Sequence, residues 1–256
     1  MISIRNVKKR FGTRQVLQGL SLDVHEGEIL VILGRSGVGK SVLLRHIIGI
    51  EKPDEGTVDV GDIRISSLSQ KEIYEAVKNM GMLFQGAALF DSMNIFENTA
   101  FYLRQHGNPS KEKPYTEEEI KRKVKAALKM VGLEGEGEKL PADLSGGMRK
   151  RAGLARLLVY RPKILLYDEP TTGLDPITAQ QINELIVQTQ EELQGTSIVV
   201  THDIHSALYI ADRLALHEGG KIAYVKKPKE FLEIDDPTIT FLKDTLYNHP
   251  SARNQL

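Results

Sequence analysis

One stretch of this chain reads Gly34-Arg35-Ser36-Gly37-Val38-Gly39-Lys40-Ser41, with the apolar run 29–33 directly before it and a helix-like run, 42–48, after it. That order predicts a strand, a glycine-rich loop and a helix. Glycines let the loop turn its backbone N–H groups inward around phosphate oxygens, and the helix N-terminus adds a partial positive charge. Lys40 can then reach the β- and γ-phosphates of a nucleotide, while Ser41 can bind Mg²⁺. The alternative, a glycine turn beside a solvated lysine, is disfavoured by the strand and the helix on either side.

The composition excludes some classes of partner. The 256 residues include 34 basic and 34 acidic ones, so no global field attracts a nucleic acid or an anionic membrane. The chain has no cysteine, which excludes disulfides and thiolate metal sites and fits a reducing cytoplasm. No apolar run approaches the ~20 residues that span a bilayer, and the N-terminus has no signal-like core. We therefore expect a soluble chain, and if it works at a membrane a partner must hold it there.

The hydrophobic pattern alternates between strands and helices. Residues 2–32 favour short alternating strands, and residues 57–60 and 63–65 favour a hairpin. Apolar strands at 164–167 and 197–201 are each followed by a helical period. Such alternation predicts an α/β fold with a mostly parallel sheet that is covered on both faces.

Between about residues 86 and 160 the pattern changes to helical periods, with a polar interruption at 106–114. Thr116 with Glu119 three residues later predicts a capped helix start, and the lysines that follow fit a solvated helix face better than a nucleic-acid patch. We interpret this segment as a helical subdomain inserted into an ATPase domain of residues 1–225. Residues 226–256, with three prolines and one modest helical period, are predicted to be a C-terminal extension.

Two adjacent carboxylates, Asp168 and Glu169, close the apolar strand 164–167. This places them at the carboxyl edge of the sheet, where the phosphate loop also opens. Asp168 can complete the Mg²⁺ shell with Ser41, and Glu169 can orient or deprotonate an attacking water. An isolated pair of this kind is as often an acidic helix cap or turn, but beside a phosphate loop we interpret it as catalytic.

Two further polar residues follow predicted strands. His202 comes after the strand 197–201 and can sense the γ-phosphate or position the water, although a lone histidine is more often structural. Gln85 ends the buried run 80–84 and is a neutral ligand suited to Mg²⁺ or water. Gln85 can also report movement of the segment behind it.

Over nearly its whole length the chain resembles the ATPase subunit of ATP-binding cassette (ABC) transporters. The resemblance rests on the phosphate loop, on the order and spacing of the other segments, and on these residues: Phe84-Gln85, the signature Leu144-Ser145-Gly146-Gly147-Met148, ILLYDEP at 164–170, Gly173-Leu174-Asp175 and the switch histidine His202. It implies a P-loop ATPase fold with an N-terminal antiparallel β subdomain, a mostly parallel central sheet and an inserted helical subdomain. It also implies ATP and Mg²⁺ as cofactors, and Phe11 as the aromatic ring that stacks on adenine.

The signature implies that one copy of the chain is not a complete enzyme. Ser145, Gly146 and Gly147 precede a predicted helix, so free N–H groups and the helix dipole make a second anion site there. In the family that site contacts the γ-phosphate of a nucleotide held by the other subunit, so that two copies sandwich two ATP molecules head to tail. The alternative is a glycine-rich turn that only caps the helix.

One position departs from the family pattern, because the signature usually ends in glutamine and here the residue is Met148. Met148 and the following residues 149–152, together with the segment 82–92, resemble the branch that serves phospholipid transport with MCE-domain partners. Ser145 and both glycines remain, so we expect ATPase activity to survive this change.

Apolar residues cluster just after the glutamine loop, where the family receives a short helix of its membrane permease. They are Ala87, Ala88, Leu89, Phe90, Met93, Ile95 and Phe96. The alternative is that these side chains form the small core of the helical subdomain itself. The proline-bearing tail can reach the other ATPase or a small accessory subunit, and a frayed terminus is the alternative for it.

Together these features predict an ATPase that works as a homodimer under a permease, at the cytoplasmic face of the cell membrane, and drives phospholipid movement with an MCE-domain lipid-binding protein. The alternative substrates are amino acids, ions or other small solutes. A cassette ATPase that acts on nucleic acid or ribosomes is disfavoured, because such proteins usually carry two cassettes, long coiled coils or zinc insertions, and the sequence has none of these.

Overall fold

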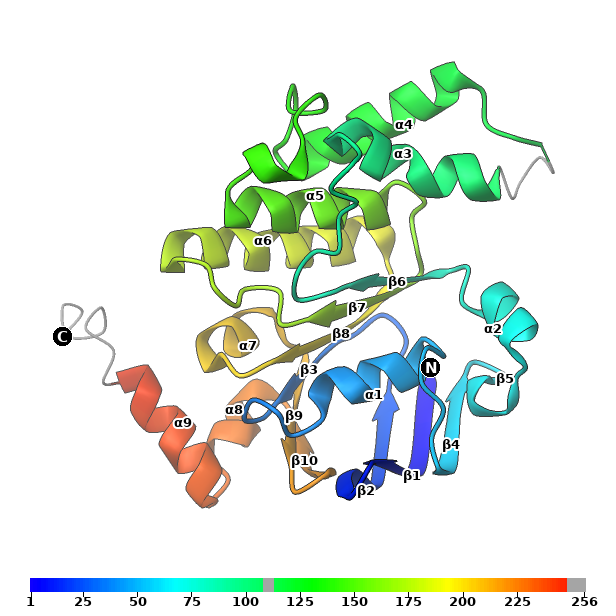
Figure 1. The fold of residues 1–256 in the computed structure, drawn as a ribbon. Helices are drawn as coiled ribbons and strands as arrows, with labels where there is room; N and C mark the ends of the chain where they lie inside the picture. The colour runs from blue at the N-terminus through cyan, green and yellow to red at the C-terminus, as the bar shows by residue number, and fades with distance from the viewer. Residues whose placement is uncertain (108–112, 248–256) are drawn as a thin grey trace. The chain divides into compact units, whose positions relative to one another are not determined.

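The computed structural model describes residues 1–107 and 113–247, and the chain divides into two compact units (Figure 1). Unit 1 combines Met1–Lys78 with Gly195–Leu256, and unit 2 is the continuous segment Asn79–Gln194. The polar interruption expected at 106–114 falls partly on residues 108–112, and the end of the expected C-terminal extension falls on residues 248–256. Both stretches lie outside the described residues.

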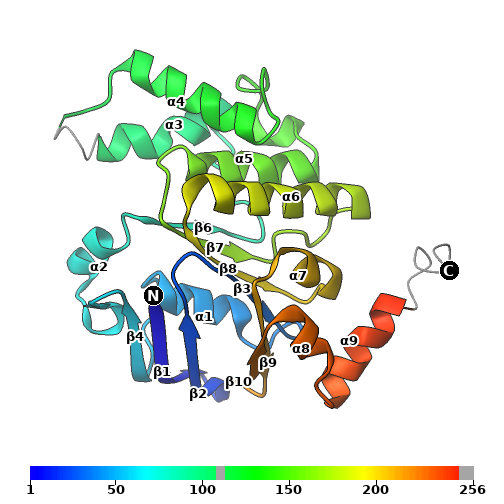
Figure 2. The same cartoon turned by 180° about the vertical axis from the view of Figure 1, so that it is seen from behind.

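The first sheet of unit 1 is antiparallel. Strand β1 (Ile2–Phe11) lies between β2 (Arg14–Val24) and β4 (Glu55–Val60) (Figure 2). The short strand β5 (Ile63–Arg64) pairs with β4. Alternate side chains along β1 and β2 are buried, as expected for a sheet with one face on a core. The expected N-terminal antiparallel β subdomain and its hairpin at 57–65 are confirmed.

The second sheet of unit 1 carries the phosphate loop. Its strands, in order across the sheet, are β10 (Lys221–Lys226), β9 (Arg213–Glu218), β3 (Ile29–Leu33) and β8 (Thr196–Thr201). β3 runs parallel to both β8 and β9, and only the β9–β10 pair is antiparallel among these. All five residues of β3 are buried, as is typical of a central parallel strand. Leu33 is aligned with Thr201, so Gly34 and His202 leave the sheet at the same edge.

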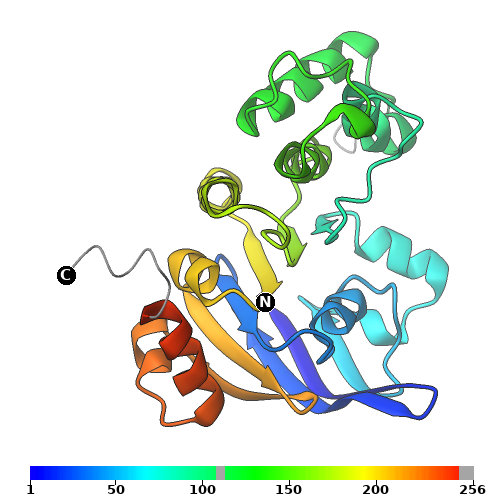
Figure 3. The ribbon, with the colours of Figure 1, turned by 60° about the vertical axis from the view of Figure 1, so that its left-hand side comes forward.

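The helices of unit 1 include two from the predicted extension. α8 packs against β9, β10 and α9, and α9 also contacts α7 (Figure 3). Phe231 and Ile239 are fully buried, so the tail contributes side chains to the core of unit 1, which its weak helical period did not indicate. The bounds are α1 Lys40–Ile47, α2 Gln70–Ala76, α7 Ile204–Ile210, α8 Pro228–Leu232 and α9 Pro237–Tyr247, with a 3₁₀ turn at Ile65–Ser67.

Unit 2 is mainly helical, around a pair of parallel strands. β6 (Met80–Leu83) pairs with β7 (Ile164–Asp168), and α5 contacts β6. Helices α3, α4 and α5 contact one another, and α5 also contacts α6 (Figure 1). Their bounds are α3 Ile95–His106, α4 Glu117–Met130, α5 Gly146–Leu158 and α6 Pro176–Leu193, with a 3₁₀ turn at Pro141–Asp143. The expected helical subdomain is thereby confirmed.

Local signals position several helix starts. Ser69 and Glu72 form a reciprocal capping box at α2, and Thr116 and Glu119 form another at α4, as predicted. Asp175 caps α6 through the N–H groups of Ile177 and Thr178. In the part of the chain that the structure describes, no helix combines the length and the hydropathy that crossing a membrane requires.

Candidate functional site

The glycine-rich loop joins β3 to α1 in unit 1, and its glycines have a steric reason. Gly37 has a φ of 78° and Gly39 a φ of 110°, both in the region that L side chains rarely adopt. A Cβ at Gly34 would lie 2.6 Å from the main-chain oxygen of His217, and a Cβ at Gly39 would lie 2.6 Å from the side chain of Val16. Only glycine therefore fits these positions.

Lys40 lies at the first position of α1 and folds back over the loop. Its Nζ donates to the main-chain oxygens of Gly34, at 2.6 Å, and Arg35, at 3.1 Å. From β2, the guanidinium of Arg14 donates to the oxygen of Gly37 at 2.7 Å. A glycine loop, a lysine and a helix N-terminus in this order fit the phosphates of a nucleoside triphosphate.

His202 and the phosphate loop line one cavity. The cavity has a volume of about 380 Å³, and its walls include Gly34, Arg35 and Ser36 as well as His202. Phe241 and Leu242 of α9 form another part of the wall. The structure thus brings the predicted switch histidine to the loop, as the alignment of β3 with β8 requires. No sequence pattern indicated that the tail would contribute to this cavity.

His217 lies beneath the phosphate loop and was not singled out by the sequence. It is 1% exposed, and neither ring nitrogen has a hydrogen-bond partner in the structure. Burial, with a smaller effect from the charge of Lys40, lowers the pKa of His217 to about 4. The imidazole is therefore neutral at physiological pH, and it adds no charge beneath the loop.

Phe11, the predicted adenine-stacking residue, ends β1 and is 44% exposed. The ammonium of Lys9 lies 5.4 Å from the centroid of the Phe11 ring. Lys9 in turn pairs with Glu51 and Asp54, at 2.7 and 3.3 Å. An exposed ring with a cation fixed over it can still offer a surface for a base.

Asp168 and Glu169 lie in unit 2, at the end of β7, and are 4% and 7% exposed. Glu169 has a φ of 49°, which is uncommon for a residue with a Cβ. Its Oε2 accepts a hydrogen bond from the hydroxyl of Thr172 at 2.8 Å. The predicted Mg²⁺ ligands are Ser41, Gln85 and Asp168, which offer a hydroxyl, an amide and a carboxylate. These oxygen donors suit a Mg²⁺ ion whose other ligands are nucleotide phosphates and water.

The signature also lies in unit 2, at the start of α5. Ser145 is the N-cap, and its hydroxyl accepts from the N–H of Met148 at 3.3 Å. A Cβ at Gly147 would lie 2.4 Å from the side chain of Thr178, so α5 and α6 approach too closely for any other residue. Ser145 and Gly146 are exposed, which leaves the N-terminus of this 13-residue helix accessible.

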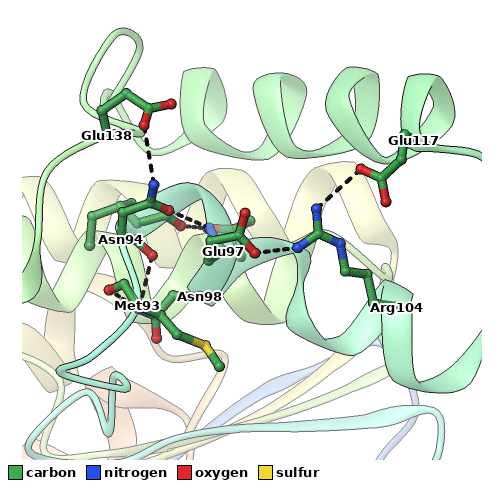
Figure 4. A network of polar contacts seen from close by, with 9 residues as sticks. Met93, Asn94, Glu97, Asn98, Arg104, Glu117 and Glu138 are labelled. Atoms are coloured by element: carbon green, nitrogen blue, oxygen red, sulfur yellow. Dashed lines mark hydrogen bonds and ion pairs between the residues drawn. The ribbon is translucent and has the colours of Figure 1, made fainter.

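The segment after Gln85 is fixed by one buried side chain. β6 ends at Leu83 rather than at the predicted Gln85, because the chain turns at Phe84 and Gln85 is exposed. Asn98 is fully buried, accepts from the N–H of Phe90 at 2.8 Å and donates to three carbonyls, those of Phe90, Met93 and Asn94, at 2.9–3.0 Å. Figure 4 shows this network, together with the ion pairs of Arg104 to Glu97 and Glu117.

The predicted site residues divide between the two units. Unit 1 holds Phe11, the loop 34–41 and His202, and unit 2 holds Gln85, the signature 145–147, Asp168 and Glu169. Sequence reasoning missed Arg14, Lys150 and His217. Arg14 and Lys150 donate to main-chain oxygens, and His217 lies beneath the phosphate loop. All three contacts join residues that only the fold brings together.

Comparison with known proteins identifies the family. The ABC transporter family profile matches residues 17–172. The chain is 39% identical to the probable ribonucleotide transport ATP-binding protein mkl of Mycobacterium leprae over 238 residues, 93% of this chain and 67% of that protein. It is 42% identical to the methionine import ATP-binding protein MetN of Clostridium tetani over 230 residues, 90% of this chain and 70% of that protein. The chain thus spans about two thirds of the length of these curated relatives.

Solved structures share the fold. A dimeric post-hydrolysis state of the ATP-binding cassette MJ0796, bound to ADP and Pi, matches with a TM-score of 0.80 at 31% identity, over 89% of this chain and 99% of that one. CbiO1 of Clostridium perfringens, part of the ABC transporter complex cbiONQ, matches with a TM-score of 0.79 at 30% identity, over 99% of this chain and 97% of that one. The chain therefore belongs to the ABC transporter family, and its fold is that of the cassette that binds and hydrolyses ATP.

Proposed function

We propose that this chain powers the uptake of a small solute, as the ATPase of a transporter with a membrane-embedded permease. The observation that carries this proposal is the similarity over 90% or more of the chain to proteins named for methionine import and for ribonucleotide transport. The chain would then lie at the cytoplasmic face of the cell membrane, held there by the permease. Nucleic acid is not a partner in this proposal, since the net charge of the chain is zero.

We propose a role for each site residue from its chemistry and from the resemblance to the family. Lys40 and the N–H groups of the loop 34–41 hold the phosphates of ATP, and Phe11 stacks on the adenine. Ser41, Gln85 and Asp168 bind Mg²⁺, which neutralises the phosphate charge. Glu169 orients and deprotonates the attacking water, and His202 contacts the γ-phosphate from the edge of β8.

A second copy of the chain completes each site. The exposed N-terminus of α5, with Ser145, Gly146 and the N–H of Gly147, is suited to the γ-phosphate of a nucleotide held by the partner. Two copies would then close head to tail around two ATP molecules, and hydrolysis would release them. The dimeric cassette MJ0796, which this chain resembles at 31% identity, supports this arrangement.

Phospholipid transport with an MCE-domain protein is a second candidate. It is supported by Met148 with residues 149–152, and by the segment 82–92, which resemble that branch of the family. The relatives found by comparison are named for ribonucleotide transport and for methionine import, so uptake of a small solute is the better supported of the two.

ATPase assays on purified variants test the enzymatic proposal. Lys40→Ala should abolish hydrolysis, and Glu169→Gln should bind ATP but remain as a closed dimer on size-exclusion chromatography. Ser145→Ala should lower turnover, because it removes the contact to the partner's nucleotide. Full turnover by a demonstrably monomeric protein, indifferent to Ser145→Ala, would refute the proposed dimer.

Co-purification from the native cell tests the substrate. A tagged Glu169→Gln chain is extracted with detergent, and the proteins that accompany it are identified by mass spectrometry. A permease with a solute-binding protein supports uptake of a small solute, while a permease with an MCE-domain protein supports phospholipid transport. Recovery of ribosomes or nucleic acid in place of a permease would contradict both.

A further inference from the structure

Lys150 is a buried lysine that none of the roles above explains. It lies on α5, five residues after the N-cap Ser145, and is 6% exposed. Its Nζ donates to the main-chain oxygen of Glu169 at 3.1 Å. Burial lowers the pKa of Lys150 below its ordinary value, and the charges of Asp168 and Glu169 oppose that shift. Burying an ammonium group is costly, so a lysine in this position needs a partner, and its partner is the residue at the end of β7.

Glu169 is fixed at its backbone as well as at its carboxylate. Its φ of 49° lies in the left-handed region, which costs a residue with a Cβ about 1–2 kcal/mol. Its carbonyl oxygen accepts two hydrogen bonds, from the Nζ of Lys150 and, at 3.3 Å, from the N–H of Thr172. Its carboxylate accepts a third, from the hydroxyl of Thr172. Since the allowed rotamers of a side chain depend on φ and ψ, the donors that hold the carbonyl also restrict where the carboxylate can point, and the hydroxyl of Thr172 restricts it further.

We propose that Lys150 is a positioning residue for Glu169, which it holds by its main-chain carbonyl in the conformation that directs the carboxylate to the water. This inference rests on the proposed role of Glu169. Lys150 itself touches neither nucleotide nor water in this mechanism.

The position of Lys150 has a second consequence. Its helix begins with Ser145, Gly146 and Gly147, which are proposed to contact the nucleotide of the other copy. One rigid helix thus connects the part of a chain that serves its partner's ATP with the residue that acts on its own ATP. Closure of the dimer on one nucleotide would then set the position of Glu169 at the other.

Steady-state kinetics with three substitutions test the positioning role. Lys150→Met removes the donor and should lower kcat about 100-fold, the usual effect of a misplaced catalytic group, while the dissociation constant for ATP changes less than about twofold. Lys150→Gln keeps a neutral donor on a shorter side chain and should show a smaller loss in the same direction. Lys150→Arg keeps a charged donor and should recover most of kcat. Lys129→Met, at an exposed lysine on α4, is the matched control and should behave as the native chain.

The outcomes separate this inference from the proposal on which it depends. If Glu169→Gln still hydrolyses ATP, the role of Glu169 is wrong. If Glu169→Gln stops hydrolysis but Lys150→Met keeps its kcat, the inference about Lys150 is overturned. Loss of ATP binding would show that Lys150→Met fails to fold. In that case the comparison of Lys150→Gln with Lys150→Arg decides. Equal kcat values for these two variants would overturn the inference about Lys150.

Mixed dimers, purified through two different tags, test which nucleotide site Lys150 serves. One pairs a Lys150→Met chain with a Glu169→Gln chain, so that the only intact Glu169 has lost its own Lys150. The other pairs a native chain with a Lys150→Met/Glu169→Gln chain, so that the intact Glu169 keeps its Lys150. We expect the first dimer to be slow and the second to match a native/Glu169→Gln dimer. The reverse pattern would show that Lys150 acts through the signature instead, and would overturn the inference.

Discussion

The guanidinium of Arg156 donates to the main-chain oxygen of Ala88 at 2.6 Å, and this bond joins the second half of α5 to the segment after the glutamine loop. A second bond reaches the oxygen of Ala87 at 3.2 Å. Ala87 and Ala88 have φ values of 62° and 49°, so two successive alanines are held in the left-handed region. Such a conformation persists only where its surroundings fix it, and Arg156 is one of the groups that do so.

Replacing Arg156 by Gln should loosen this segment. Two hydrogen bonds from a charged donor are lost, which lowers the free energy of local opening by about 2 kcal/mol and speeds amide exchange about 30-fold. Hydrogen–deuterium exchange of peptides covering residues 84–93 measures this. Arg122→Gln, at an exposed arginine on α4, is the control, and exchange that is equal in the two variants would contradict the expectation.

A charge at Phe90 should separate transport from hydrolysis. Ala87 and Ile95 of the predicted apolar cluster are buried in unit 2, as the alternative interpretation expected for part of it, but Phe90 is 40% exposed and Leu89 is partly exposed. If the permease docks there, the carboxylate of Phe90→Asp would have to lose its water on docking, which is costly. The substitution should therefore uncouple transport while basal ATPase activity persists. Transport and hydrolysis are measured together with the co-purified permease. Equal loss of both activities would count against a docking role.

Asn98→Ala should be strongly destabilising. The substitution leaves the partly buried N–H and carbonyl of Phe90 without the partners that the buried Asn98 supplies, and we expect the free energy of unfolding to fall by about 3 kcal/mol. Urea unfolding measures the difference. Asn98→Asp keeps an acceptor for the N–H but places a second oxygen against three carbonyls, so it should be at least as destabilising as Asn98→Ala. A change below about 1 kcal/mol for Asn98→Ala would show that the network contributes little.

Phe11→Ala should weaken ATP binding, because stacking of a base on an aromatic ring contributes about 1–3 kcal/mol. We expect the dissociation constant to rise about tenfold or more, and Phe11→Tyr to restore it. Titration with a fluorescent ATP analogue provides the measurement. Tyr74→Ala is a matched control, since Tyr74 is also an exposed ring with a lysine, Lys78, over it. If both alanine variants bind ATP like the native chain, Phe11 does not stack on the base.

His217 should make the fold sensitive to acid. Its pKa is about 4 in the folded chain and about 6.5 when unfolded, so the unfolded chain binds the proton first as the pH falls. The free energy of unfolding therefore has its full value at pH 7 and falls as the pH drops from 6.5 towards 4. Between pH 7 and pH 5 the neutral His217 accounts for a loss of about 2 kcal/mol. The side chain in His217→Gln does not titrate. Its free energy of unfolding, measured in urea, should therefore fall by about 2 kcal/mol less than that of the native chain between pH 7 and pH 5. The exposed His25→Gln serves as control, and a slope unchanged by His217→Gln would contradict the prediction.

The sequence predicted the parts of the fold that depend on local signals. The capping box at Thr116 and the helical period after the strand 164–167 were placed correctly, because a cap and a helical period lie within a few residues. The strands β9 and β10 were not predicted. The pairing of β9 with β3 is a long-range relationship, whereas β9 and β10 form a local hairpin in which Glu218 is aligned with Lys221. β10 is a partly exposed strand with no clear apolar alternation.

The same division holds for the site. The phosphate loop, Asp168 and Glu169 were predictable because the chemistry and the flanking strand lie together in the sequence. Lys150 and Arg156 were not, since their partners are carbonyls that lie 19 and 68 residues away. A main-chain acceptor has no side-chain identity to recognise, so residues that act on the backbone become visible only in the folded chain.

The strand β3, which ends at the phosphate loop, lies between two partners that both come from residues after 195. During synthesis on the ribosome the loop therefore emerges long before either edge of β3 can be paired. A nascent chain halted before Gly195 would present five consecutive apolar residues, Ile29–Leu33, on an unpaired strand, which favours aggregation or capture by a chaperone. Unit 2 is continuous in the sequence, whereas the strand that carries the phosphate loop cannot be paired on either side until the residues after 195 have been made.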